Sequence, residues 1–186
     1  MPSGKTHDSI TLWCWPAIAG LGWGITHHAG LALVASGCFL FSGLMFGPDL
    51  DIHSQQYRRW GWLRWIWLPY RQSLHHRSIL SHGFLVGTTL RLLYLALLIG
   101  TVVGSGILGW SIARHSLGQG DWLAFAMPLW QQAWQPIGQS WQQYPEYWLA
   151  SFVGLEAGAM SHSLSDWVGS KLKRWRNRRL KKTKPS

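Results

Sequence analysis

The chain has 186 residues, of which 47% are hydrophobic and only 13% are charged, and its formal net charge is +10. The length fits one domain or one compact bundle, and the charged share is about half the usual one. Nine of the 17 basic residues lie between Lys171 and Lys184, so the positive charge is local and a nucleic-acid-binding surface is disfavoured. The two cysteines, Cys14 and Cys38, fit neither a disulfide framework nor a CxxC metal motif, and we interpret them as core residues.

Four apolar segments follow one another along the chain. The first two, residues 9–26 and 29–48, carry no charge. The third, about 83–110, includes 19 consecutive uncharged residues, and the fourth, 147–161, is interrupted by Glu156. Because a spanning helix needs about 20 mostly apolar residues, the third segment is a good candidate and the others are borderline. A soluble helical protein with buried helices is the alternative, and the mean hydropathy of +0.00 favours it.

The positions of the basic residues favour the membrane interpretation. Fifteen of the 17 Lys and Arg lie near the N-terminus, in the connection 52–82 or in the C-terminal tail, whereas the connection 111–146 carries only Arg114. Under the positive-inside rule, four spans with both termini in the cytoplasm satisfy this distribution. We therefore predict an all-α fold, an antiparallel bundle of about four membrane-spanning helices. It would form one domain over residues 1–170, followed by a basic cytoplasmic tail over residues 171–186.

The outer connection contains an amphipathic pattern. Four apolar residues recur at i, i+4, i+7 and i+11 with glutamines between them: Trp130, Trp134, Ile137 and Trp141. This spacing predicts a helix with one apolar face, kinked at Pro136. We expect it to lie flat in the outer membrane interface, with a packed soluble helix as the alternative.

Acidic residues are scarce, and they gather with histidines at the ends of the apolar segments. “THD” precedes the first segment, “PDLDIH” follows the second, “HHRSILSH” precedes the third and “SHSLSD” closes the fourth. An antiparallel four-helix bundle would bring these ends together on the cytoplasmic side. Mixed imidazole and carboxylate ligands suit a divalent metal ion, zinc in the first place and manganese or iron as alternatives. We therefore predict one or two metal ions per chain.

Two of these motifs have spacings that suit chelation. His162 and Asp166 are four residues apart, which places them on one face of a helix. Asp49 and Asp51 lie two residues apart in a short turn, where carboxylates can bind or bridge cations. Each motif alone is more often a turn, a cap or a surface hydrogen bond, so the metal interpretation depends on their occurrence together.

The third motif needs a turn of the chain. His76 and His82 are six residues apart, and they can converge only if the backbone turns between them. Ser78 or Ser81 would make a natural helix N-cap at that point. The remaining histidines at the opposite membrane face are interpreted as ordinary residues: His27, His28 and His115.

The order of “PDLD”, “HRS..SHG” and “SHSLSD” resembles the bacterial inner-membrane metal-dependent hydrolase family. The start “MPSGKTHD” and the centre “GPDLDIHS” look more like a related family of uncharacterised metal-binding membrane proteins, common in cyanobacteria. The resemblance covers about residues 1–95 and 150–170, and it implies a bacterial plasma or thylakoid membrane. It also implies seven metal ligands, with Asp8 as an additional one: His7, Asp49, Asp51, His76, His82, His162 and Asp166.

These observations favour a metal-dependent hydrolase of a phosphoester or lipid-type substrate at the cytoplasmic surface. Arg77, next to the ligand His76, is predicted as the phosphate-binding residue of catalysis. A non-enzymatic structural or regulatory metal-binding membrane protein is the alternative, because eight ligands could saturate two metals without a coordinated water. The basic tail fits attraction to anionic lipid headgroups better than binding of nucleic acid.

Overall fold

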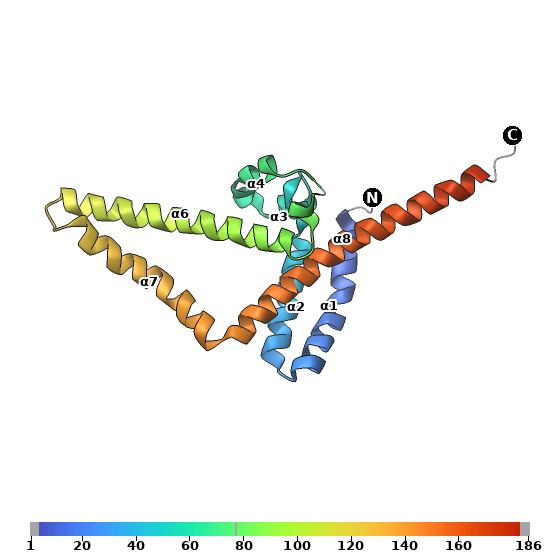
Figure 1. Cartoon of the computed structure of the whole chain (residues 1–186), viewed down its shortest axis with the longest axis horizontal. Helices are drawn as coiled ribbons and strands as arrows, with labels where there is room; N and C mark the ends of the chain where they lie inside the picture. The colour runs from blue at the N-terminus through green and yellow to red at the C-terminus, as the bar shows by residue number, and fades with distance from the viewer. Residues whose placement is uncertain (1–3, 77, 183–186) are drawn as a thin grey trace. The chain divides into compact units, whose positions relative to one another are not determined.

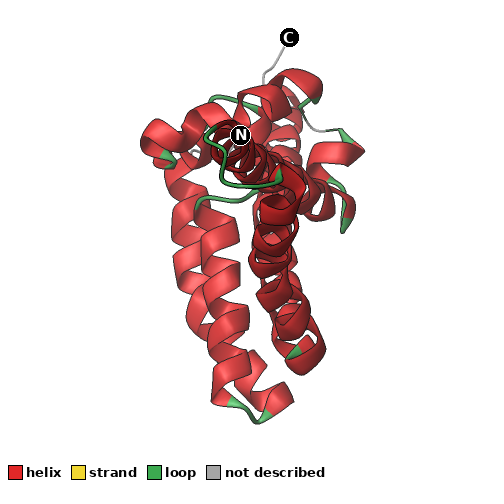
Figure 2. Cartoon of the chain, turned by 90° about the vertical axis from the view of Figure 1, so that its left-hand side faces the viewer, coloured by secondary structure: helices red, strands yellow, loops and turns green. Residues whose placement is uncertain are grey.

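The computed structural model describes residues 4–76 and 78–182, and every regular element in these ranges is a helix (Figure 2). The all-α prediction is thereby confirmed. In chain order the elements are α1 (Gly4–Thr26), α2 (Ala29–Leu44), the 3-10 helix η1 (Pro48–Asp51), α3 (Gln55–Arg59), the 3-10 helix η2 (Gly61–Trp67), α4 (Leu68–Ser73), α5 (Ile79–His82), α6 (Val86–Ser116), α7 (Trp122–Gln143) and α8 (Pro145–Lys182).

The four apolar segments correspond to α1, α2, α6 and α8, and the amphipathic segment lies within α7. Two stretches of the described chain, Ala29–Asp51 and Val86–Ser116, are long and apolar enough to cross a membrane by length and composition. Membrane spanning by α1, α2, α6 and α8 stays a prediction. The helix α8 is much longer than the apolar segment 147–161, because it continues through the basic residues that follow.

The chain divides into two compact units. The first consists of Met1–Leu90 and Leu149–Ser186, and the second of Arg91–Trp148. The first unit contains α1 to α5 and nearly all of α8, while the second contains α7 and most of α6. All the predicted metal ligands belong to the first unit.

Small residues allow the long helices of the first unit to approach closely (Figure 1). At Gly154 and Gly158 of α8, an added Cβ atom would lie only 2.2 Å and 2.4 Å from carbonyl oxygens of α2. At Gly43 of α2, an added Cβ would lie 2.5 Å from the side chain of Thr11 in α1. Only glycine permits such contacts, and packing through small residues is common between membrane helices. The helix α2 therefore has α1 and α8 as close neighbours.

The segment after α2 folds over an aromatic cluster. The buried ring of Trp67 contacts the rings of Phe46, Trp60 and Tyr70, with centroids 5.7, 5.2 and 5.6 Å away. The indole N–H of Trp60 donates a hydrogen bond to the carbonyl of Met45 at 2.9 Å. Aromatic pairs of this kind bury a large apolar area. The cluster thus fixes the chain on both sides of η1.

Candidate metal centre

The turn η1 is tied down through its backbone, which leaves its two aspartates free to face other side chains. Ser54 donates a hydrogen bond to the carbonyl of Asp49 at 2.8 Å, and its Oγ also caps α3. Gln56 lies against the glycine that precedes η1 and donates to the carbonyl of Gly43 at 2.9 Å. These hydrogen bonds fix the backbone around η1, and with it the positions from which Asp49 and Asp51 extend.

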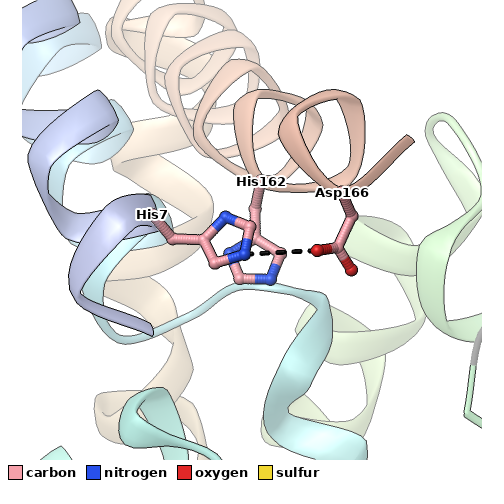
Figure 3. A group of neighbouring side chains, drawn as sticks. All are labelled: His7, His162 and Asp166. Atoms are coloured by element: carbon pink, nitrogen blue, oxygen red, sulfur yellow. Dashed lines mark ion pairs between the residues drawn. The ribbon is translucent and has the colours of Figure 1, made fainter. Parts of the chain in front are cut away.

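The first group of possible ligands joins α1 and α8 (Figure 3). His7 of α1 and His162 and Asp166 of α8 are buried, and each offers one ligand atom within 4.8 Å of the others. The two imidazole rings stack with centroids 3.9 Å apart, and His7 Nε2 lies 3.2 Å from Asp166 Oδ1. The spacing of four residues does place both α8 side chains toward the same site.

Ser165 fixes the orientation of His7. Its hydroxyl donates to the carbonyl of His162 at 2.8 Å and lies 2.7 Å from His7 Nδ1. Because the hydroxyl proton is already used, Nδ1 of His7 is assigned as the donor and Nε2 keeps its lone pair. The lone pair of His7 Nε2 and the carboxylate of Asp166 repel each other when nothing lies between them. A bound cation would be attracted to both and would remove this repulsion. Burial, and then the neighbouring His162, lowers the pKa of His7, and the neutral form is the one that binds metal.

The second group consists of Asp49, His76 and His82, whose ligand atoms also lie within 4.8 Å of one another. His76 Nδ1 lies 2.9 Å from Asp51 Oδ1, so Asp51 orients this ring and leaves Nε2 available. His82 Nδ1 lies 2.8 Å from the hydroxyl of Ser81, and its Nε2 lies 3.7 Å from Asp49 Oδ1. In both histidines Nδ1 is held by a neighbouring side chain, and Nε2 of His82 lies toward Asp49.

Asp49 links the two groups. Its Oδ2 lies 3.1 Å from His162 Nε2, while its Oδ1 faces His82. Within the described part of the chain, buried atoms at this site without a hydrogen-bond partner include Asp49 Oδ1, Asp51 Oδ2, His82 Nε2 and His162 Nδ1. Buried polar atoms are normally satisfied, so this set fits metal ions. A cavity of about 20 Å³ beside His7, Asp49 and His162 has room for a single ion or water.

Two predicted ligands, Asp8 and Asp51, lie outside the two groups. Asp8 lies outside both groups, because Arg59 donates hydrogen bonds to both of its carboxylate oxygens, and this pairing raises the pKa of Arg59. Asp51 contacts Nδ1 of His76 and orients this ring, and it is not one of the three ligands of the second group. Arg77 lies outside the described residues.

The serines of the site were only partly anticipated. Of the two predicted N-caps, Ser78 caps α5, and its Oγ accepts a hydrogen bond from the N–H of Ser81. Ser81 itself is buried against His82, and Ser165 was missed. The motif “SHSLSD” did contain a signal for Ser165, since a serine three residues after a helical histidine returns to the carbonyl of that histidine.

A polar pocket of about 300 Å³ opens beside both groups. Its lining includes His82 from the second group and Asp166 from the first, together with Arg174. A molecule bound in this pocket would therefore reach both ligand groups.

Residues 2–176 match the family described as “Uncharacterized metal-binding protein (DUF2227)”. The chain belongs to this family. An “Uncharacterized protein” of Aquifex aeolicus (strain VF5) is 36% identical over 58 residues, which are 31% of this chain and 40% of that protein. The chain thus spans about two fifths of the length of this curated relative. No solved structure matches. Membership of DUF2227 confirms the predicted metal-binding family, and with the two ligand groups it supports a bound metal ion.

Proposed function

We propose that this protein binds two divalent metal ions in one centre bridged by Asp49, and that it hydrolyses a phosphoester at the cytoplasmic face of a bacterial membrane. The observation that carries this proposal is that the two oxygens of Asp49 face different ligand groups, Oδ1 toward His82 and Oδ2 toward His162. Each group combines two imidazoles with one carboxylate, a set that suits zinc, manganese or iron. We propose zinc.

The second group favours catalysis over a purely structural role. It supplies three protein ligands, Asp49, His76 and His82, and a tetrahedral ion would keep a fourth position open. Divalent cations bound here would lower the pKa of a coordinated water and bind an anionic substrate. The protein contributes the orientation of the ligands, through Asp51 behind His76 and Ser81 behind His82. We keep Arg77 as the proposed phosphate-binding residue.

We further propose that α1, α2, α6 and α8 span the membrane as an antiparallel bundle, with α7 in the outer interface. The apolar length of α2 and α6 supports this arrangement. On α1, six large apolar side chains are exposed, which suits contact with lipid: Leu12 by 53%, Trp13 by 84%, Trp15 by 40%, Leu21 by 61%, Trp23 by 58% and Ile25 by 78%. The basic C-terminal tail would then lie in the cytoplasm and attract anionic headgroups.

A structural or regulatory metal site is the second candidate function. It is favoured by the first group, since His7, His162 and Asp166 are all buried, as in a closed structural site. In that case the protein would bind metal without turnover.

The number of bound metal ions tests the dinuclear centre. Elemental analysis of the full chain purified in detergent should give two equivalents. Asp49→Ala should lose both ions, while His162→Ala and His76→Ala should each lose one. His53→Ala is the matched control, because His53 is an exposed histidine close to η1 and outside both groups. If the native protein held only one equivalent and His76→Ala retained it, the proposal of two metal ions bridged by Asp49 would be contradicted.

Hydrolysis tests the enzyme proposal separately. The metal-loaded protein should cleave bis(p-nitrophenyl) phosphate, and the rate should fall to background after chelation. Arg77→Gln should keep both metal ions and lose most of the turnover. If the protein holds two ions but cleaves neither this diester nor any phospholipid, the structural alternative stands.

A further inference from the structure

Two pockets of different chemistry meet along α8 in the first unit. The polar pocket beside the metal ligands is lined also by Ser163, Trp167 and Arg174. The second pocket, of about 640 Å³, is lined mainly by apolar side chains of α1, α2 and α8, Met160 and Leu164 among them. Ser163 and Trp167 belong to both linings, so the two pockets are adjacent. Both volumes fall in the usual range of ligand pockets, about 300–1,000 Å³.

We infer that the two pockets together hold one amphiphilic substrate, with an anionic phosphate-type headgroup in the polar pocket and a hydrocarbon chain in the apolar pocket. The inference rests on the proposed function and names its substrate class. On the polar side, the guanidinium of Arg174 is a planar donor that matches a phosphate, and the hydroxyl of Ser163 adds a further donor. Both lie next to the ligands His82 and Asp166, where the ester would be cleaved.

The apolar pocket has the form that an alkyl chain requires. Its α8 wall runs from Ala157 to Trp167, which corresponds to about 15 Å at 1.5 Å per residue. Met160 and Leu164 are four residues apart and therefore form a continuous stripe along this wall. Cys14 of α1 also lines this pocket. A fully polar substrate would leave this surface unused.

Trp167 stands at the junction and is held there. The ammonium group of Lys171 lies 3.7 Å from the centroid of its ring, a cation–π contact. Trp167 lines both pockets, and its indole combines a large apolar ring with one polar N–H group. A ligand that extends past Trp167 into both pockets therefore needs a polar part on one side and an apolar part on the other.

The test compares two phosphonates, whose P–C bond resists hydrolysis, on the metal-loaded full chain in detergent. Titration calorimetry should show octylphosphonate binding at least about tenfold more tightly than methylphosphonate, since each buried methylene contributes up to about fourfold. Leu164→Asp should abolish this advantage and leave the methylphosphonate affinity unchanged. Leu149→Asp is the matched control, as Leu149 is an equally exposed leucine of α8 outside the pocket, at 64% against 60%.

The polar half is tested in the same way. Arg174→Gln should weaken both phosphonates by about tenfold and keep their ratio, whereas Arg176→Gln, an exposed neighbour outside the pocket, should change neither. If Leu164→Asp fails to fold, Met160→Trp fills the same pocket and should also abolish the advantage. Equal affinities for both phosphonates in metal-loaded protein would overturn the inference. The apolar pocket would then be a surface for bulk lipid or for a second protein. Absence of metal would instead overturn the proposed function.

Discussion

The contact between Gly158 and α2 makes metal binding depend on helix packing. In Gly158→Ala, the new Cβ would lie 2.4 Å from the carbonyl oxygen of Phe39. A comfortable contact needs about 3.5 Å, so α8 must move away from α2 by about 1 Å at this point. His162 lies four residues further along the same face and must move with it. Its Nε2 would then withdraw from Asp49 Oδ2, which lies 3.1 Å away in the native structure.

Two effects of opposite sign determine the stability of this variant. Alanine gains up to about 1 kcal/mol over glycine in helix propensity. Overpacking of a close contact costs about 1–3 kcal/mol. We therefore expect a net loss of up to about 2 kcal/mol in the free energy of unfolding, together with loss of the metal ion at the first group. Gly37→Ala on α2 is the matched control, because an added Cβ there meets no atom within 4 Å.

The assay is thermal unfolding in detergent, with and without a chelator, combined with elemental analysis. Gly158→Ala should lower the Tm and lose one metal ion, whereas Gly37→Ala should keep two ions and raise the Tm. The reasoning is refuted if both variants shift the Tm alike and both retain two ions, since the close approach of α8 to α2 would then be unnecessary for the site.

Three further outcomes are expected. Asp51→Ala and Ser165→Ala should each lower the affinity for one metal ion by about 10–100-fold, measured in competition with a chelator, because each removes the group that orients a ligand. An unchanged affinity would count against these roles. Asp8→Asn should keep both ions and change the unfolding free energy by about 1 kcal/mol or less, as expected for a partly exposed ion pair, and loss of metal on elemental analysis would restore Asp8 as a ligand. In a chain without native cysteines, an impermeant thiol reagent applied to intact cells should label Gln139→Cys and not Gln55→Cys, and labelling at the second position would exclude a cytoplasmic site.

The sequence predicted the convergence of the ligands because that convergence depends on helix order and spacing. The residues of “THD” lie at the start of α1, those of “PDLD” follow α2, and those of “SHSLSD” lie where the apolar part of α8 ends. A bundle brings such positions together. The pair His162 and Asp166 followed from helix periodicity alone. Residue spacing within a helix and the order of helices along the chain can both be read from a single sequence.

The division of roles among neighbouring residues could not be predicted in the same way. His7 and Asp8 are adjacent, but successive residues of a helix point about 100° apart, and only His7 faces α8. The partner of Asp8 is Arg59, which comes from a different part of the chain. Asp49 and Asp51 likewise separate into a bridging and an orienting residue, because the geometry of η1 directs them to different histidines.

The length of α8 was underestimated for a related reason. Hydropathy reports only the apolar part of a helix, whereas Lys and Arg are themselves good helix formers. The helix therefore continues past Asp166 into the basic region, and this extension carries Arg174 to the polar pocket.

The origin of the ligands along the chain has a consequence for biosynthesis. Asp49, His76 and His82 are all present once the first half of the chain has been made, so the second group can load a metal ion early. The first group needs His7 from α1 and two residues of α8, and it cannot form until the last helix has entered the structure. Binding of an ion at the first group would thus report that α8 has packed against α1, and a chain truncated before α8 would retain at most one ion.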